Sequence, residues 1–100
     1  MRVEFKSTKL KKRYESIREG ERAWGNEVAR RYVERIGILY NIREIDDLKS
    51  MPQLKYHPLT GNRQGQHAIT LISRWRLVFT LEGVEQDTIR IEEVSKHYGD

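Results

Sequence analysis

The residues best able to do chemistry lie in one basic part of the chain. No aspartate or glutamate occurs between Asp47 and Glu82, although the chain has 15 acidic residues. This stretch and the C-terminal tail carry a set of basic and aromatic side chains: Lys55, His57, Arg63, His67, Arg74, Arg76, Lys96, His97 and Tyr98. Arginine can bind phosphate through two parallel hydrogen bonds, and histidine titrates near neutral pH. The set therefore suits phosphate binding with proton transfer beside it.

These side chains match the needs of RNA cleavage without a metal. A base must remove the proton of the 2′-hydroxyl, a cation must stabilise the charged phosphorane, and an acid must protonate the departing 5′-oxygen. Histidine, arginine and lysine or tyrosine can fill these three roles. The sequence has no cluster of carboxylates or histidines at metal-ligand spacing, so we expect no metal and no other cofactor.

Each candidate also has a structural interpretation. His57 suits a turn before a proline, His67 suits an exposed position on a strand, and Arg74 suits a surface charge. Arg76 differs from these, because it lies within a strand between two large apolar residues. A cation there needs either a carboxylate partner or a ligand.

The elements that position these residues divide the chain into a helical half and a strand-rich half. Alternating residues predict a short strand over Arg2–Phe5. The spacing of Leu10, Tyr14 and Ile17, four and three apart, then predicts one helix with a single apolar face that ends near Gly20. A second helix is predicted by apolar residues that recur every fourth position: Trp24, Val28, Tyr32, Ile36 and Tyr40. One more helical turn should end before Pro52.

After Pro52 the period of the pattern changes to two. The segments QLKYHPL, HAITLIS, WRLVFTL and TIRIEEV are predicted strands, and TGNRQG is a predicted loop. We expect an α+β fold with an antiparallel sheet and two N-terminal helices packed on one face. Trp75, Leu77, Phe79 and Leu81 should face the helices. The opposite face, which carries Arg76, should be left for solvent or a ligand.

Composition sets the broad class of the protein. The 100 residues make one domain, 1–100. A net charge of +4 suits a nucleic acid or an acidic protein partner, although a merely soluble basic domain would look the same. The chain has no cysteine, which excludes disulfides and thiolate zinc sites. The sequence has neither a signal peptide nor a membrane-spanning segment, so we expect a cytoplasmic protein with no membrane partner.

The second half of the chain resembles the HigB branch of the RelE/ParE toxin superfamily, the plasmid maintenance killer proteins. The resemblance lies in the block HPLTGNRQGQHAITLISRWRLVF, which is followed by a last strand and VSKH. The resemblance is detailed over residues 54–97 and covers residues 1–50 only in layout. It implies a small RelE-like fold and a type II toxin that inhibits translation as a ribosome-dependent mRNA endoribonuclease. The implied partners are the 70S ribosome, mRNA and a HigA-like helix-turn-helix antitoxin, through which alone the toxin would reach operator DNA.

The resemblance also implies roles for single residues. His57 stands at the family's catalytic histidine, Arg76 at the arginine that contacts the scissile phosphate, and His97 at the C-terminal histidine. Where the family often has lysine, three residues after the first histidine, this chain has Thr60.

The tail departs from the family pattern as well. Ser95 and Lys96 replace the usual Asp-Tyr before the last histidine, so Lys96 and Tyr98 are further candidates for the proton donor. We expect four other residues to bind RNA: Lys55, Arg63, His67 and Arg74.

Two other functions fit the same fold. One is a ParE-like toxin that inhibits DNA gyrase without cleaving nucleic acid, which would not need the histidines. The other is a catalytically inactive module that binds RNA or an antitoxin, which the departures from the family pattern allow.

Overall fold

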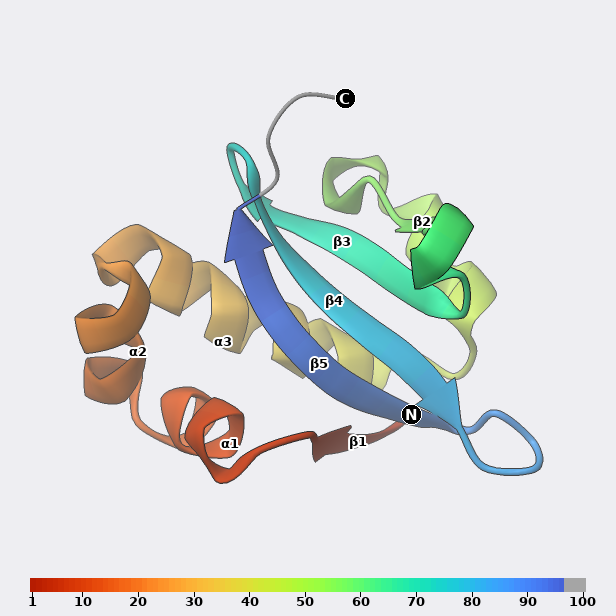
Figure 1. Ribbon diagram of the computed structural model, residues 1–100, viewed down its shortest axis with the longest axis horizontal. Helices are drawn as coiled ribbons and strands as arrows, with labels where there is room; N and C mark the ends of the chain where they lie inside the picture. Colours follow the sequence, from red (N-terminus) through yellow and green to blue (C-terminus); the bar gives the residue numbers. More distant parts are fainter. Residues whose placement is uncertain (97–100) are drawn as a thin grey trace.

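The computed structural model describes residues 1–96, which form a five-stranded sheet with helices on one side (Figure 1). The elements in chain order are β1 (Arg2–Phe5), α1 (Thr8–Glu15), α2 (Ile17–Trp24), α3 (Asn26–Asn41), the 3-10 turns η1 (Ile45–Ser50) and η2 (Pro52–Leu54), β2 (His57–Pro58), the 3-10 turn η3 (Gly61–Arg63), β3 (Gln66–Ile72), β4 (Trp75–Glu82) and β5 (Thr88–Lys96). The expected α+β fold is confirmed.

The strands lie in the order β1-β5-β4-β3-β2. β1 runs parallel to β5, whereas the other neighbouring strands are antiparallel. The expected wholly antiparallel sheet is therefore wrong for one strand. Alternating residues indicate that a segment is a strand, but its direction depends on its neighbour, and β1 pairs with the last strand of the chain.

Within residues 1–96, three α-helices rather than the expected two lie between β1 and β2. The first expected helix breaks at Ser16, whose backbone is extended and whose N–H donates to the carbonyl of Lys12 at 2.8 Å. The next helix, α2, runs through Gly20, which had been expected as a stop, to Trp24. A Cβ at Gly20 would lie 3.1 Å from the Cβ of Ala29, so glycine lets α2 pack closely on α3.

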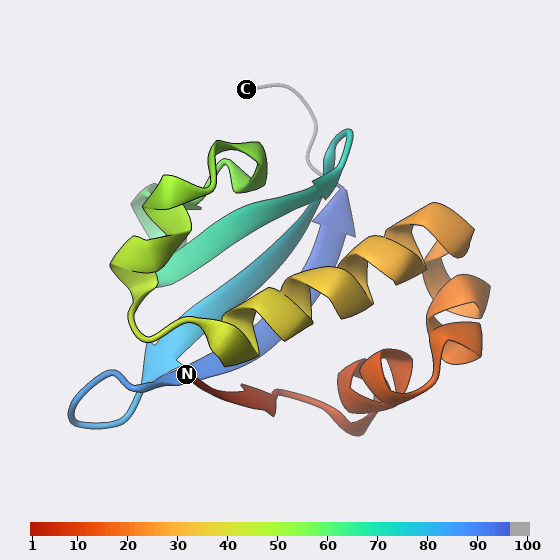
Figure 2. The same cartoon turned by 180° about the vertical axis from the view of Figure 1, so that it is seen from behind.

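The core fills the space between α3 and the sheet face turned toward it (Figure 2). Val28, Tyr32 and Ile36 of α3 pack in one cluster with Leu77 and Phe79 of β4, as expected. Both β4 residues are fully buried. No helix within residues 1–96 is long and apolar enough to cross a membrane.

The sheet face turned away from α3, here called the outer face, carries Thr70, Arg76 and Ser95 in one cross-strand row. A β-bulge interrupts the pairing of β4 and β5 on this face. Val78 lies opposite Glu93, but the next residue of β4 lies opposite Ile91, so β5 has one extra residue there. The bulge leaves two successive glutamates of β5 close to residues of the outer face.

Candidate functional site

Arg76 and Ser95 form the centre of the candidate site. They lie opposite each other on β4 and β5. The Nε of Arg76 and the Oγ of Ser95 are both buried, and neither has a hydrogen-bond partner within residues 1–96. None of the ion pairs within residues 1–96 involves Arg76. An unsatisfied buried polar group costs about 1–3 kcal/mol, so the pair favours an acceptor such as a phosphate oxygen.

His57 lies on the same face, two strands from Arg76. Its ring is exposed, and Nδ1 lies 3.0 Å from the carbonyl oxygen of Lys55. A carbonyl only accepts hydrogen bonds, so Nδ1 carries the hydrogen when the ring is neutral. The other ring nitrogen, Nε2, is then the basic one and can take a proton from a ligand. β3 lies between β2 and β4, so these two strands are two strand spacings, or about 10 Å, apart.

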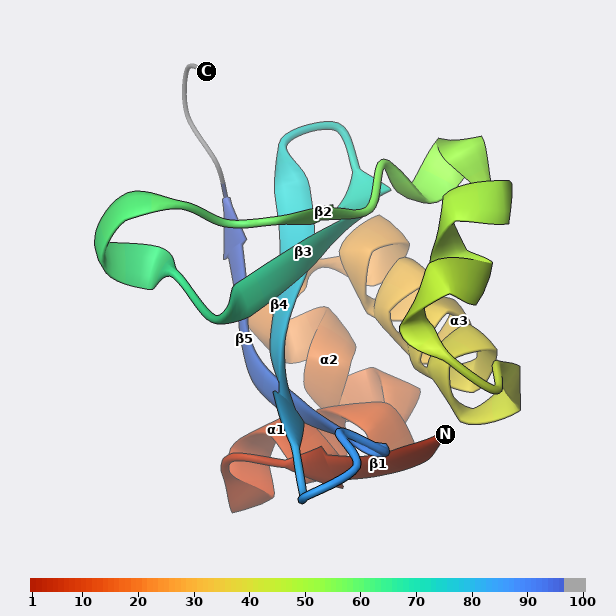
Figure 3. The ribbon, with the colours of Figure 1, turned by 90° about the vertical axis from the view of Figure 1, so that its right-hand side faces the viewer.

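The loop between β2 and β3, which contains η3, lies over part of the outer face. An ion pair holds it there. Arg63 of η3 donates from Nη2 to Glu93 at 2.6 Å and from Nε to the side-chain oxygen of Gln66 at 2.8 Å. Ala68 and Val78, in the row between His57 and Glu93, are 1% and 0% exposed. Figure 3 shows the loop with η3 on the side of the sheet away from α3.

Two carboxylates of β5 lie beside the basic stretch between Asp47 and Glu82. This stretch has no acidic residue of its own, but the fold brings Glu92 and Glu93 next to it. Glu93 pairs with Arg63, and Glu92 lies 3.3 Å from the hydroxyl of Thr80 and 3.5 Å from Nζ of Lys6. Arg63, which we expected to bind RNA, therefore already has a carboxylate partner.

His67 lies away from the outer face. It is opposite Phe79 in register, and the rings of His67, Phe79 and Tyr56 form one stacked group. The centroid of the His67 ring is 5.4 Å from that of Phe79 and 5.8 Å from that of Tyr56. The hydroxyl of Tyr56 is 2.8 Å from Nδ1 of His67. Burial lowers the pKa of His67 and raises the pKa of Tyr56. The expected RNA-binding residue is thus placed in a stacked aromatic group on the core side of the sheet.

The remaining candidates lie at the edges of the site. Lys55 is exposed two residues before the start of β2, and Arg74 is exposed in the turn between β3 and β4. Lys96 lies opposite Trp75, with its Nζ 5.8 Å from the indole ring. Since residues alternate along a strand, Lys96 and Ser95 point to opposite faces. The expected catalytic candidates His97 and Tyr98 lie outside the described residues.

Two residues of this site were not among the sequence candidates. Ser95 departs from the family pattern, and Glu93 lies in the predicted last strand, but neither was a predicted site residue. Both share the odd positions of the buried Ile89 and Ile91, so strict alternation would place them on the core side, and only the β-bulge turns them to the outer face. The sequence pattern shows neither this bulge nor the positions of Arg76 and Arg63 beside them.

Comparison with known proteins gives structural neighbours only. No protein-family model and no curated protein sequence matches the chain. A YoeB/ParE toxin from Agrobacterium tumefaciens matches with a TM-score of 0.58 and 20% identity, over 98% of this chain and 100% of that one. The YoeB–YefM complex from Staphylococcus aureus gives a TM-score of 0.60 and 19% identity over 98% of both chains.

YafQ from E. coli strain BL21(DE3) is a third neighbour, with a TM-score of 0.58 and 16% identity over 96% of this chain and 93% of that one. These similarities extend over nearly the whole of each chain. They confirm the expected fold, that of the small RelE/ParE-type toxins.

Proposed function

We propose that this chain is the toxin of a type II toxin–antitoxin pair, of the HigB kind, and that it cleaves mRNA on the ribosome. The main support is Arg76: a cation on the outer face with a buried, unsatisfied Nε beside the unsatisfied hydroxyl of Ser95. The toxin fold of the neighbours and the exposed His57 on the same face add to it.

In the proposed reaction the scissile phosphate docks against Arg76 and Ser95. Nε2 of His57 accepts the proton of the 2′-hydroxyl, and the carbonyl of Lys55 holds the ring in the tautomer that this step needs. The 2′-oxygen attacks phosphorus, and the guanidinium stabilises the added negative charge. The bond from phosphorus to the 5′-oxygen then breaks, which leaves a 2′,3′-cyclic phosphate.

The departing 5′-oxygen must receive a proton from an acid. His97, Lys96 and Tyr98 are the proposed candidates for this role. The reaction needs no metal, because side chains fill all three roles. Within residues 1–96, no three histidine or carboxylate side chains lie close enough together to hold a metal ion.

The partners follow from the proposed reaction. The ribosome and mRNA place the toxin in the cytoplasm. A HigA-like antitoxin with an acidic segment would match the basic surface and speed association. A neighbour that was solved as a YoeB–YefM complex supports the idea that toxins of this fold bind a second protein.

A second candidate function is inhibition of DNA gyrase, since one neighbour is named a YoeB/ParE toxin. The deciding experiment incubates the purified protein with 70S ribosomes programmed with mRNA, and in parallel with gyrase and relaxed plasmid. We expect cleaved mRNA with a 2′,3′-cyclic phosphate and a 5′-hydroxyl, and normal supercoiling. Intact mRNA together with lost supercoiling would reverse the assignment. Binding without cleavage would indicate an inactive module.

A further inference from the structure

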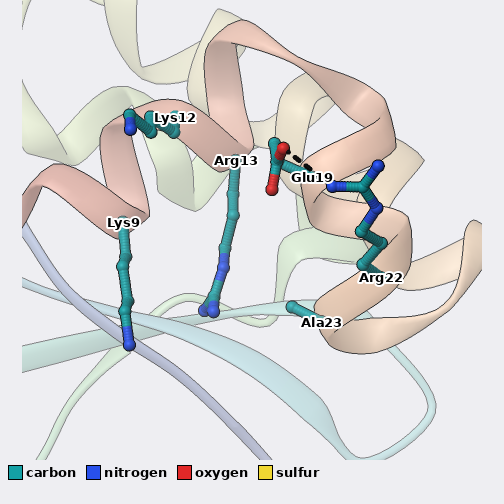
Figure 4. A pocket seen from close by; sticks show the side chains of 6 residues that line it. All are labelled: Lys9, Lys12, Arg13, Glu19, Arg22 and Ala23. Carbon is teal, nitrogen blue, oxygen red and sulfur yellow. Dashed lines mark hydrogen bonds and ion pairs between the residues drawn. The ribbon is translucent and has the colours of Figure 1, made fainter.

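A second basic site lies outside the outer face, in the corner between α1 and α2. A hollow of about 270 Å³ is lined by Lys9, Lys12, Arg13, Glu19, Arg22 and Ala23. Four cations and one carboxylate give this lining a net charge of +3. Figure 4 shows Lys9 and Arg13 extending side by side from α1, with Glu19 and Arg22 on α2.

Most of this charge has no compensating partner. Glu19 pairs with Arg22 at 3.1 Å. Lys9, Lys12 and Arg13 have no carboxylate partner among the residues that the structure describes. These three lie at positions i, i+3 and i+4 of one helix, where side chains are neighbours. Their mutual repulsion favours an anionic ligand.

The backbone of this corner is held in place by contacts with α3. The hydroxyl of Tyr32 on α3 donates to the carbonyl of Leu10 at 2.7 Å and ties α1 to the core. The guanidinium of Arg13 lies 5.0 Å from the ring centroid of Trp24, which itself packs edge-on against Tyr32. Gly20 allows α2 to approach α3 closely. The backbone of the site is therefore in place before any ligand arrives.

We propose that this corner binds the phosphate backbone of single-stranded RNA. A series of cations along one helix suits a ligand whose negative charges also come in series. Ala23 is the one apolar residue of the lining, so the hollow offers little to the apolar side chains that anchor most peptides. Phosphate contacts need only cations and polar groups. An acidic protein segment therefore fits less well than RNA.

The position of the corner suits an RNA that also reaches the outer face. Figures 1 and 2 both place α1 and α2 beside the β5 side of the sheet, whereas β2 and η3 lie on the other side. A strand that leaves Arg76 across β5 would run toward this corner. The inference rests on the proposed function for its choice of RNA as the ligand, and it extends the RNA contact well beyond the scissile phosphate.

The test measures binding of a fluorescein-labelled single-stranded RNA by fluorescence anisotropy, without ribosomes and at several salt concentrations. The variant is Lys9→Gln with Lys12→Gln, both exposed. The matched control is Arg30→Gln with Arg43→Gln, two exposed cations outside the corner. We expect the variant to bind RNA more weakly by a factor on the order of 10 at 0.1 M salt. The slope of the logarithm of the binding constant against the logarithm of the salt concentration should fall in magnitude by about 1.4, because each of the two lost phosphate contacts contributes about 0.7.

Equal RNA affinities and salt slopes for the variant and the control would overturn the proposal, as would wild-type protein that does not bind RNA at low salt. Loss of poly-glutamate binding with unchanged RNA binding would instead assign the corner to an acidic protein. Melting temperatures of all proteins check folding. Because no cleavage is measured, a failure of the proposed nuclease activity would leave the binding result readable, and the two failures can be told apart.

Discussion

Arg76 and Ser95 face each other across β4 and β5, and each carries a buried polar atom that has no hydrogen-bond partner in the part of the chain that the structure describes. A folded protein rarely keeps two such groups side by side, because each lowers its stability. The arrangement is understandable if both groups are kept for a ligand that supplies the missing acceptor. Strain and unsatisfied groups of this kind tend to mark functional sites.

The first prediction concerns the charge on Arg76. Arg76→Ala should lower the rate of mRNA cleavage by a factor on the order of 10²–10³, because a preorganised donor acts mainly on charge that develops in the transition state. Arg76→Lys should restore only part of the rate, since an ammonium lacks the planar fork. Single-turnover cleavage and ribosome binding should be measured together. Parallel losses in both would make Arg76 one docking contact among many.

The second prediction concerns the hydroxyl of Ser95. Ser95→Ala removes a buried hydroxyl that has no hydrogen-bond partner among the described residues, so the free energy of unfolding should stay within about 0.5 kcal/mol or rise. The cleavage rate should nevertheless fall by roughly 10- to 100-fold, because the hydroxyl would donate to a charged phosphate oxygen. Urea unfolding and cleavage rates check the two parts. A variant that is clearly less stable yet cleaves normally would show that the hydroxyl has a structural role.

The third prediction asks whether Arg63 binds RNA or serves only as the ion-pair partner of Glu93. Glu93→Gln removes the carboxylate that pairs with Arg63 and leaves its positive charge uncompensated on the outer face. The pair is about 40% exposed, so the loss of stability should be small, at most about 1 kcal/mol. RNA affinity should rise and its salt dependence should steepen. Glu85→Gln, in the exposed loop before β5, is the matched control, and equal effects in both variants would exclude a specific role for the pair.

The fourth prediction follows from the buried ring of His67. Burial lowers its pKa below the usual value near 6.5, so the unfolded chain binds a proton more readily than the folded one. His67 thus contributes stability that is present above about pH 6.5 and is lost as the pH falls through its lowered pKa. The melting temperature should drop between pH 7 and pH 5. The melting temperature of His67→Phe, which keeps an aromatic ring beside Tyr56 and Phe79, should drop less over this pH range. An identical pH dependence in the variant and the wild type would contradict the assignment.

Local patterns in the sequence predicted most of the elements and one side of the core. Leu77 and Phe79 were expected to face the helices, and both are fully buried. Alternation along a strand is a local property, so it can be read from neighbouring residues. The helical spacing of apolar residues gave a wrong prediction for Ile17, which was expected on the apolar face of a single helix. Ile17 instead begins α2 and is 43% exposed, because the helix breaks at Ser16.

The chemistry of the site depended on contacts that local patterns do not carry. Arg63 and Glu93 are 30 positions apart in the chain, and their pairing depends on how a loop folds over the sheet. The same loop explains why Val78, an outer-face residue, is buried. The burial of His67 against Phe79 depends on the register between β3 and β4. Resemblance to a toxin family could point to Arg76, but only the fold places Ser95 beside it.

The last prediction concerns proton transfer by His57 and His97. If one is the base and the other the acid, the cleavage rate should have a bell-shaped pH profile, and substitution of either by glutamine should remove one limb. Each single substitution should lower the cleavage rate by about 10²–10⁴-fold. The double variant should lose less activity than the product of the two single effects. His57→Gln should remove the limb of the base, because the carbonyl of Lys55 leaves Nε2 as the basic nitrogen. His97→Gln variants that cleave mRNA at the wild-type rate would remove that residue from the mechanism, and Lys96→Gln and Tyr98→Phe would then identify the acid.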